Sequence, residues 1–394
     1  MKNFSGIKGF EEFCDFIQMD SLEKEARREM LKNSNMCFQV NEYYASLIKQ
    51  QNGVNKQQLL NIVLPPIGPK PFTGRFDPYG NTKYRQEDKI YLQHKYKQTL
   101  LVHINNSCFC RCQFCYKVNE VNNDTSFSYQ QIVADAVDYI KRHPSINNVL
   151  LTGGDPMTLS DAALEHILIE FGKIPQIKGV RIATKAISFY PQRFENERLL
   201  AFFKHYSKNI SIIAQISHPA EFSEIMICAV NKIQKAGASV RLQPVLARGI
   251  NDDVKTLVQL FQRAYENNII PYYLVLFMPV RGVEQYALPM EEAYKIVAKV
   301  SDELSGLEKK SLFITANDYG KFEICGFLPS VNQPQEIILK WHQIAQSKYL
   351  PEVLLNQMVA APFSLMKLKF ESGCIYNIDD VFHFNNINTS EGDI

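Results

Sequence analysis

The sequence lacks three features that would restrict where the protein works and what it binds. Its 394 residues carry 43 Lys and Arg against 41 Asp and Glu, so no excess of one charge predicts a nucleic-acid-binding face. No stretch reaches the roughly 18 consecutive apolar residues of a membrane-spanning helix. The first residues, MKNFSGIKGFEEFC, lack the apolar core of a secretory signal. We therefore expect a soluble, cytoplasmic protein that binds neither nucleic acid nor membrane.

Cysteine, by contrast, is concentrated in one short stretch. The sequence NNSCFCRCQFCYKVN, residues 105–119, holds four of the nine cysteines, Cys108, Cys110, Cys112 and Cys115. An odd number of cysteines without a secretory signal favours a reducing compartment. Clustered thiols in such a compartment more often bind metal or take part in catalysis than form disulfides.

The middle of the chain alternates between short apolar runs and amphipathic segments. The apolar runs predict strands at 100–104, 148–153, 179–185, 210–216, 239–245, 271–277 and 311–316. Helical periodicity predicts helices between them, at 129–143, 159–174, 221–237, 254–268 and 289–304. This alternation predicts βαβ units and a parallel sheet. The fold class we expect is α/β, a partial (β/α) barrel of about six parallel βα units, with a doubly wound open sheet as the alternative.

Three regions follow from this pattern. Residues 1–98 are expected to form an N-terminal helical and irregular arm, in which the Pro- and Gly-rich stretch 63–81 crosses the barrel. The partial barrel is assigned to residues 99–326. Residues 327–394 form a C-terminal extension, and their one helical pattern predicts a helix at 335–346.

Three interpretations of the cysteine cluster are open. A structural zinc site normally needs a second pair of ligands, and the sequence offers no other CxxC and no HxxxH. Incidental buried cysteines would rarely lie so close together. In the third interpretation, Cys108, Cys112 and Cys115 form a CxxxCxxC triad that holds three irons of a [4Fe–4S] cluster and leaves the fourth open to a cofactor. Cys110 then remains on the same loop without binding iron.

The cysteine triad, with Phe114 before its last member, resembles the signature of the radical S-adenosylmethionine (SAM) superfamily. The turn LLTGGDP, one βα unit later, resembles the GGE motif with which this superfamily receives the amino group of SAM. Four longer segments resemble the lysine 2,3-aminomutase family, namely 149–194, HPAE (218–221), LARGINDD (246–253) and PYYLV (271–275). The resemblance extends over roughly residues 90–326, and the fold that it implies is an open, partial barrel.

The resemblance also implies a reaction and its cofactors. A [4Fe–4S] cluster would cleave SAM reductively to a 5′-deoxyadenosyl radical, which abstracts hydrogen from an amino acid. Pyridoxal 5′-phosphate (PLP) would assist the 1,2-migration of the amino group, so the enzyme class is an aminomutase, an isomerase. The implied partners are an amino-acid-like small molecule and an electron donor such as flavodoxin or ferredoxin; a homo-oligomeric state is left open.

Six positions match the residues that contact SAM in the family, and they are Gly153, Gly154, Asp155, Thr184, Lys185 and Gln243. The two glycines allow close backbone approach, and Asp155 supplies a charge for an ammonium group. Lys185 replaces an arginine of the family but keeps a cation for the SAM carboxylate. Gln243 is expected in the middle of a strand, where an amide without a partner would be costly to bury.

The PLP site matches the family less closely. The lysine that binds PLP corresponds to Lys321, expected in a loop after the last strand, where the family's glycine run has shrunk to Gly320. Lys95 and Tyr96 are compatible with phosphate binding, but Thr99 stands where the family has an arginine. These departures leave a second candidate open, a PLP-free radical SAM enzyme that catalyses another radical reaction. A non-enzymatic iron–sulfur or zinc protein is the third.

The substrate positions depart furthest. The arginine that binds the substrate carboxylate is replaced by Lys117, a point charge without bidentate geometry. The two aspartates that hold the distal ammonium of lysine correspond to Met278 and Ile314, and an ammonium buried against them would lack a counter-charge. We therefore expect an amino-acid substrate other than lysine. Arg281 lies near enough in the sequence to suggest an anionic or polar distal group.

Overall fold

A large parallel sheet lies at the centre of the molecule. The computed structural model describes residues 2–68, 73–86, 88–120, 128–328, 335–346, 348 and 365–370. In this part of the chain, eight strands are hydrogen-bonded in the order β11-β9-β8-β7-β6-β5-β4-β3. Their bounds are β3 Arg85–Gln86, β4 Lys89–Tyr96, β5 Thr99–Asn105, β6 Asn148–Gly153, β7 Gly179–Thr184, β8 Asn209–Ala214, β9 Ser239–Leu242 and β11 Ile270–Pro271. Strands β5 to β9 and β11 are parallel, and β3 and β4 extend one edge in antiparallel fashion.

A second sheet of six strands follows the first, in the order β10-β12-β13-β14-β15-β16. Its strands are β10 Val245–Leu246, β12 Tyr273–Leu276, β13 Leu312–Asn317, β14 Gly320–Leu328, β15 Gln335–Ile344 and β16 Leu365–Phe370. The first three are parallel and the last three antiparallel. The chain passes from β9 to β10 through Gln243 and Pro244, and proline cannot donate to a ladder, so the strand is interrupted there.

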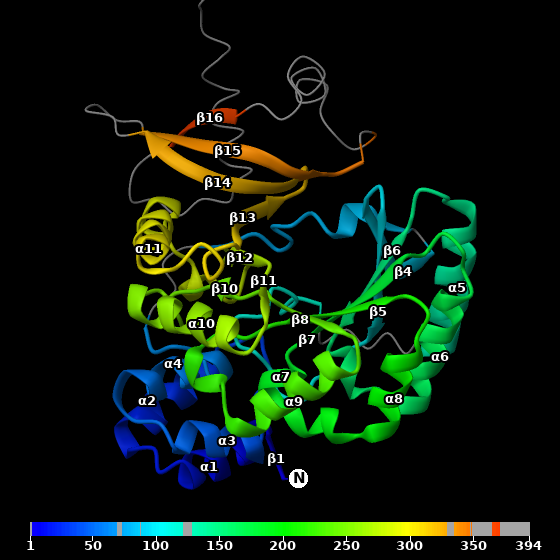
Figure 1. Ribbon diagram of the computed structural model, residues 1–394. Coiled ribbons are helices and arrows are strands. Elements are labelled where there is room, and N and C mark those ends of the chain that lie inside the picture. The colour runs from blue at the N-terminus through cyan, green and yellow to red at the C-terminus, as the bar shows by residue number, and fades with distance from the viewer. Residues whose placement is uncertain are drawn as a thin grey trace, which may run out of the picture.

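Helices follow the parallel strands and cover the outer face of the large sheet, where α5, α6 and α8 lie side by side (Figure 1). They are α5 Tyr129–Arg142, α6 Asp161–Gly172, α7 Ala186–Phe189, α8 Glu197–His205, α9 Glu224–Lys235, α10 Val254–Glu266 and α11 Met290–Glu303. Short 3-10 turns lie at Thr82–Tyr84, Pro156–Thr158, Pro191–Glu195, Pro219–Glu221 and Glu284–Tyr286.

Local sequence explains why these helices begin and how they pack. In α5, the Ser128 hydroxyl accepts from Gln131 N at 3.2 Å and caps the first turn. Ile132, Ala136 and Ile140, four residues apart, share one face of the helix and are buried against the sheet. Helices α6, α9 and α10 begin with the same device, a Ser or Asp cap.

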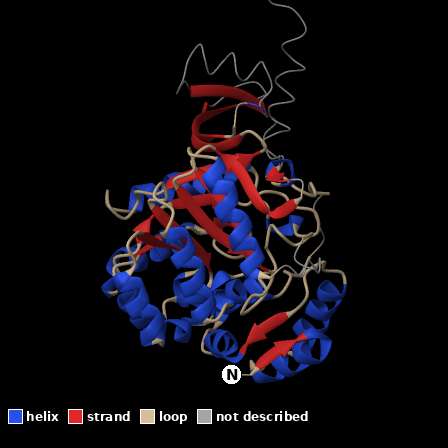
Figure 2. Ribbon diagram, turned by 90° about the vertical axis from the view of Figure 1, so that its right-hand side faces the viewer, coloured by secondary structure: helices blue, strands red, loops and turns tan. Residues whose placement is uncertain are grey.

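The N-terminal residues form a small helical module at the end of the molecule opposite to β14–β16, as both views show (Figures 1 and 2). Its elements are β1 Asn3–Ser5, α1 Gly6–Phe16, α2 Ser21–Lys32, β2 Gln39–Asn41, α3 Glu42–Lys49 and α4 Gly53–Val63, with β1 and β2 antiparallel. Phe10, Phe13 and Tyr44 are fully buried in its apolar cluster, which also contains Cys110 and Phe114. The cysteine loop therefore packs against this module.

The parallel α/β architecture predicted from the sequence is confirmed, but a barrel is not. The strands lie in two separately hydrogen-bonded sheets, and neither sheet closes on itself. The helix predicted at 335–346 is wrong: Ile337, Leu339 and Trp341 are buried at every second position of β15, which pairs with β14 and β16. Pairing with two neighbouring strands overrides the helical spacing of the apolar residues.

The division into three regions stays a prediction, and its second boundary falls inside β14. Within the stretch 63–81, residues 69–72 lie outside the described residues. Beyond them, Arg75 pairs with Val280, and Gly74 N donates to Glu284 Oε1 at 2.9 Å. Among the described helices, none combines the length and apolar character that a membrane crossing requires.

Candidate functional site

The cysteine loop leaves the carboxyl end of β5 and is held by the N-terminal module. Gln39 contributes in two ways, because its side chain donates to Cys108 O at 2.8 Å and its carbonyl accepts from Arg111 N at 2.8 Å. Ile62 O accepts from Gln113 N at 2.8 Å. The module therefore fixes the backbone that carries the thiols.

The four thiols of the loop fall into two groups. Cys110 is 1% exposed, and its Sγ accepts from Asn41 N at 3.4 Å, inside the apolar cluster of the N-terminal module. Cys108, Cys112 and Cys115 remain partly exposed. Burial raises the pKa of Cys108 to about 12 and raises those of Cys112 and Cys115, so metal binding at these thiols must release protons.

This arrangement fits a cluster better than a single metal ion. Among the described residues, no three Cys, His, Asp or Glu side chains are grouped so that they could hold one ion. In a [4Fe–4S] cluster each thiolate binds a different iron, so the three thiols converge on a cube rather than on one ion. Three partly exposed thiols on one loop are the donor set that such a cluster needs.

The GGD turn at the end of β6 supports the start of the cysteine loop. Gly154 N donates to Asn105 O and Asp155 N donates to Ser107 O, both at 2.6 Å. A Cβ on Gly153 would overlap Asn105 O, and one on Gly154 would overlap Ser107 O; Gly153 also has a φ of +126°. The close backbone approach predicted for these glycines is therefore, in this structure, an approach to their own chain.

Asp155 joins the ends of two neighbouring strands. Its Oδ1 accepts from Met157 N at 3.0 Å and from Thr184 Oγ1 at 2.7 Å, and its Oδ2 accepts from Lys185 N at 3.0 Å. Burial raises the pKa of this carboxyl, and these hydrogen bonds oppose the shift. The roles of Asp155 and Thr184 in SAM binding stay predictions.

Lys185 forms a buried ion pair and hydrogen bonds that its predicted role does not include. Its ammonium donates to Glu221 Oε1 at 2.8 Å, Gln215 O at 2.7 Å and Ser217 Oγ at 3.2 Å, which uses all three N–H bonds. Glu221 is fully buried and also accepts from the Tyr44 hydroxyl at 3.0 Å. This geometry disfavours the predicted contact with the SAM carboxylate.

Gln243 does not lie in the middle of a strand as predicted. It occupies the interruption between β9 and β10, where its backbone N–H donates to Ala214 O at 3.0 Å, and its side chain is half-buried. A side chain at a strand interruption is not enclosed by a continuous ladder. The argument that a buried amide needs a partner therefore no longer supports its predicted contact with SAM.

Lys321 lies on β14 rather than in the predicted loop. Its ammonium lies 5.2 Å from the ring centre of Tyr96 and 4.9 Å from that of Tyr273. No acid forms an ion pair with it within the described residues. Burial, together with the cations of Arg181 and Lys95, lowers the pKa of Lys321 to about 7.

Two residues beside Lys321 have roles that differ from those predicted. Lys95 donates to Tyr79 O at 2.7 Å and to Asn317 O, so its ammonium ties two backbone segments together. Gly320 has a φ of +151°, and a Cβ there would overlap Gln343 O on β15. This glycine is therefore needed where β14 and β15 come together.

The substrate positions are only partly brought together. Lys117 donates to His103 Nδ1 at 2.9 Å and to Gly153 O at 3.0 Å, and burial lowers its pKa to about 8. Met278 and Ile314 are each 1% exposed, so both positions are buried as well as apolar. Arg281 is exposed, and its Nε donates to Gly74 O at 3.4 Å. The structure does not place Arg281 with these buried positions.

Sequence reasoning missed two polar residues of the sheet. His103 is the acceptor for Lys117, and burial with the nearby cation lowers the pKa of His103 well below its usual range. Arg181 donates to groups on two other strands. The only signal in the sequence is a charged or polar residue at an alternating position of an otherwise apolar strand.

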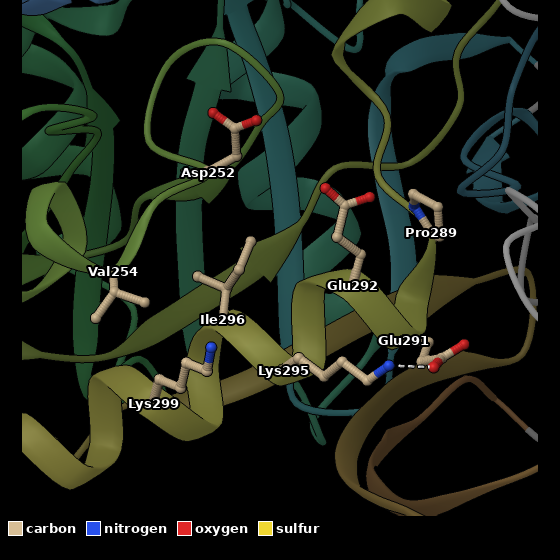
Figure 3. Close-up of a pocket in the computed structure, with 8 residues that line it drawn as sticks. All are labelled: Asp252, Val254, Pro289, Glu291, Glu292, Lys295, Ile296 and Lys299. Carbon is tan, nitrogen blue, oxygen red and sulfur yellow. Dashed lines mark hydrogen bonds and ion pairs between the residues drawn. The ribbon is translucent and has the colours of Figure 1, made fainter.

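A cleft of about 470 Å³ opens between the start of α10 and the first three turns of α11 (Figure 3). Its lining is Asp252, Val254, Pro289, Glu291, Glu292, Lys295, Ile296 and Lys299. Three acids and two lysines nearly balance, and Lys295 already pairs with Glu291. None of the predicted site residues lines this cleft.

Comparison with known proteins supports the family suggested by the motifs. No protein-family model matches the chain. A protein of Aquifex aeolicus named putative L-lysine 2,3-aminomutase is 32% identical over 338 residues, which cover 84% of this chain and 87% of the relative. The glutamate 2,3-aminomutase of Clostridioides difficile is 26% identical over 300 residues, 76% of this chain and 69% of that one. A radical SAM methyltransferase structure from Sphaerobacter thermophilus, with a TM-score of 0.41 and 14% identity over 57% of this chain and 68% of its own, is too distant to add to the argument.

The cysteine loop and these relatives together define a radical SAM enzyme. Within that class, the chain belongs to the lysine 2,3-aminomutase family. Membership implies a [4Fe–4S] cluster and SAM as cofactors.

The division of the thiols predicts unequal effects of substitution. Cys108→Ala, Cys112→Ala and Cys115→Ala should each abolish anaerobic iron loading and SAM cleavage. Cys110→Ala should retain both, because its thiol faces the N-terminal module. Iron and sulfide analysis with a 5′-deoxyadenosine assay measures the two properties. Loss of the cluster in Cys110→Ala as complete as in the others would refute the assignment.

The Lys185–Glu221 pair predicts a large effect on stability without any cofactor. Lys185→Met leaves a buried carboxylate without its cation and should lower the free energy of unfolding by about 3–5 kcal/mol. Urea unfolding of the metal-free protein measures this, and Lys185→Met/Glu221→Gln should recover part of the loss. Lys173→Met, which breaks an exposed pair with Glu170, is the matched control and should cost less than about 1 kcal/mol. If Lys185→Met leaves the free energy of unfolding unchanged, the ion pair does not occupy this lysine, and its predicted contact with SAM stands.

Proposed function

We propose that the protein is a radical SAM aminomutase that uses PLP and acts on an amino acid other than lysine. The observation that carries the proposal is the state of Lys321: a half-buried amine between two tyrosine rings, without an acidic partner among the described residues, and with a pKa lowered to about 7. With this pKa about half of the amine is neutral at pH 7 and can attack an aldehyde, whereas an ordinary lysine is almost wholly protonated.

The residues of the chain would divide the work between two cofactor sites. Cys108, Cys112 and Cys115 would hold the cluster, and Lys321 would hold PLP. When bound, the cluster with SAM supplies a radical and PLP binds the migrating amino group. Lys117, buried and oriented by His103 and Gly153 O, would present a cation to the substrate carboxylate. Reductive cleavage of SAM consumes an electron, so a donor such as flavodoxin or ferredoxin belongs to the proposal.

The proposal of a substrate other than lysine follows from the two residues that would face the distal end of the substrate. Met278 and Ile314 are buried and apolar, so the ammonium of lysine would be desolvated without an acid beside it. The exposed position of Arg281 removes the reason for expecting an anionic distal group there. That one relative is named for glutamate supports a family in which the substrate varies.

A PLP-free radical SAM enzyme is the second candidate. Thr99 carries no charge where the resemblance expects an arginine, and Lys95 already donates to two backbone carbonyls. Both observations weaken the expectation that these two residues bind the phosphate of PLP. A non-enzymatic iron–sulfur or zinc protein has no comparable support, because the chain belongs to a family of radical SAM enzymes.

Trapping with borohydride separates the two enzyme candidates. The protein incubated with PLP and reduced should carry a pyridoxyl group on Lys321, located by peptide mass. Lys321→Ala should lose this label, and Lys340→Ala, which removes a lysine from the neighbouring strand β15, should keep it. Intact SAM cleavage with no label at any lysine would exclude the aminomutase and leave the PLP-free enzyme.

The lowered pKa of Lys321 predicts the pH dependence of the same labelling. Below the pKa of about 7 the amine is protonated, so the labelling rate should fall about tenfold per pH unit; above it the rate should level off. A free lysine derivative under the same conditions should keep rising to about pH 9, because its pKa is about 10.4. The ratio of the two rates corrects for the ionisation of PLP itself. A labelling rate that rises in parallel with the reference would contradict the lowered pKa.

A further inference from the structure

Arg181 lies on the inner face of the large sheet. Along β7, Val180, Ile182 and Thr184 are buried against the outer layer, whereas Arg181 and Ala183 alternate with them and are only partly buried. In the register, Arg181 is opposite Leu150 of β6 and Ser211 of β8, so its side chain starts from the middle of three adjacent strands.

Two side chains fix the guanidinium near the amino-terminal ends of the strands. Arg181 Nε donates to Asn148 Oδ1 at 2.7 Å, and one terminal nitrogen donates to Thr99 Oγ1 at 3.2 Å. Asn148 and Thr99 are the first residues of β6 and β5, so the side chain reaches across one strand to the next. A guanidinium held at two of its five N–H groups has little freedom left and keeps donors for another partner.

The positive charge of Arg181 has no acidic partner among the described residues. Within the described part of the chain, Arg181 forms no ion pair with Asp or Glu, and its neighbourhood contains the amines of Lys95 and Lys321, the second with its pKa lowered to about 7. The positive charge of Arg181 is one cause of the lowered pKa of Lys321. Positive charges grouped in a partly buried region cost free energy unless an anion lies among them. A planar guanidinium with free donors suits a phosphate, which it can bind in bidentate fashion.

We propose that Arg181, held by Asn148 and Thr99, is a phosphate-binding site that takes the phosphate of PLP while Lys321 takes the aldehyde. The inference rests on the proposed function, because it requires that PLP binds. It answers the objection raised by Thr99: the cation missing from position 99 is delivered to the same place from β7, by way of the hydrogen bond to the Thr99 hydroxyl.

Comparison of PLP with pyridoxal, which lacks the phosphate, tests the site. The measured quantity is the dissociation constant of each compound from the borohydride-trapped fraction at Lys321. Arg181→Met should weaken PLP binding about ten- to a hundredfold more than it weakens pyridoxal binding, the range of a charge-assisted hydrogen bond, because its loss raises the pKa of Lys321 for both compounds but removes the phosphate contact from PLP alone. Arg181→Lys, which keeps the charge but loses the fork, should fall between the parent protein and Arg181→Met.

A rescue variant guards against a purely structural effect. Thr99→Arg/Arg181→Met places a cation at the other end of the same hydrogen bond and should recover PLP affinity relative to Arg181→Met by a larger factor than it recovers pyridoxal affinity. If Arg181→Met weakens PLP and pyridoxal equally, or weakens neither, while the parent protein is labelled at Lys321, the phosphate site is overturned and the proposed function stands. If the parent protein is not labelled by PLP at all, the proposed function fails and the phosphate site fails with it.

Discussion

The approach of two backbones at Gly153 and Gly154 decides where the chemistry of this protein can take place. Because neither residue has a Cβ, the end of β6 pairs with Asn105 and Ser107, and the cysteine loop leaves the sheet in one fixed direction. On one side of this contact the loop meets the N-terminal module. On the other, the carboxylate of Asp155 ties the same turn to Thr184 and the start of α7. A larger residue at either glycine would displace both sides at once.

The two ends of the inner face of the large sheet carry different kinds of side chain. Thiols lie beyond the carboxyl end of β5, whereas the guanidinium of Arg181 is held at the amino-terminal ends of β5 and β6, by Thr99 and Asn148. A strand of β5's length spans on the order of 20 Å, so the iron-binding loop and the guanidinium of Arg181 belong to opposite ends of the same sheet. Two proposed cofactors can therefore be held by separate sets of residues, and their reactive parts must meet over the strands between them.

Much of the fold follows from local pattern, and the errors occur where distant partners decide. The predicted strands and helices of the α/β region coincide with β5 to β9, β12, β13 and the main helices, because apolar periodicity and Ser or Asp caps act within a few residues. The segment 335–346 became a strand because β14 and β16 flank it. The same limit applies to the site: cysteine spacing is visible in the sequence, but the ion pair of Lys185 with Glu221 and the reach of Arg181 to Thr99 cross strands or helices.

The grip of the N-terminal module on the cysteine loop also sets an order of assembly during synthesis. Gln39 precedes Cys108 by 69 positions, so at about 5–20 residues per second the helices that receive the loop leave the ribosome several seconds before its thiols do. The part of the docking surface that precedes the loop is therefore synthesised before it, whereas Phe189 and Tyr286 of the same cluster follow later. Once the cluster is complete and the loop is docked, Cys110 is enclosed, and iron meets only the three thiols that stay partly exposed.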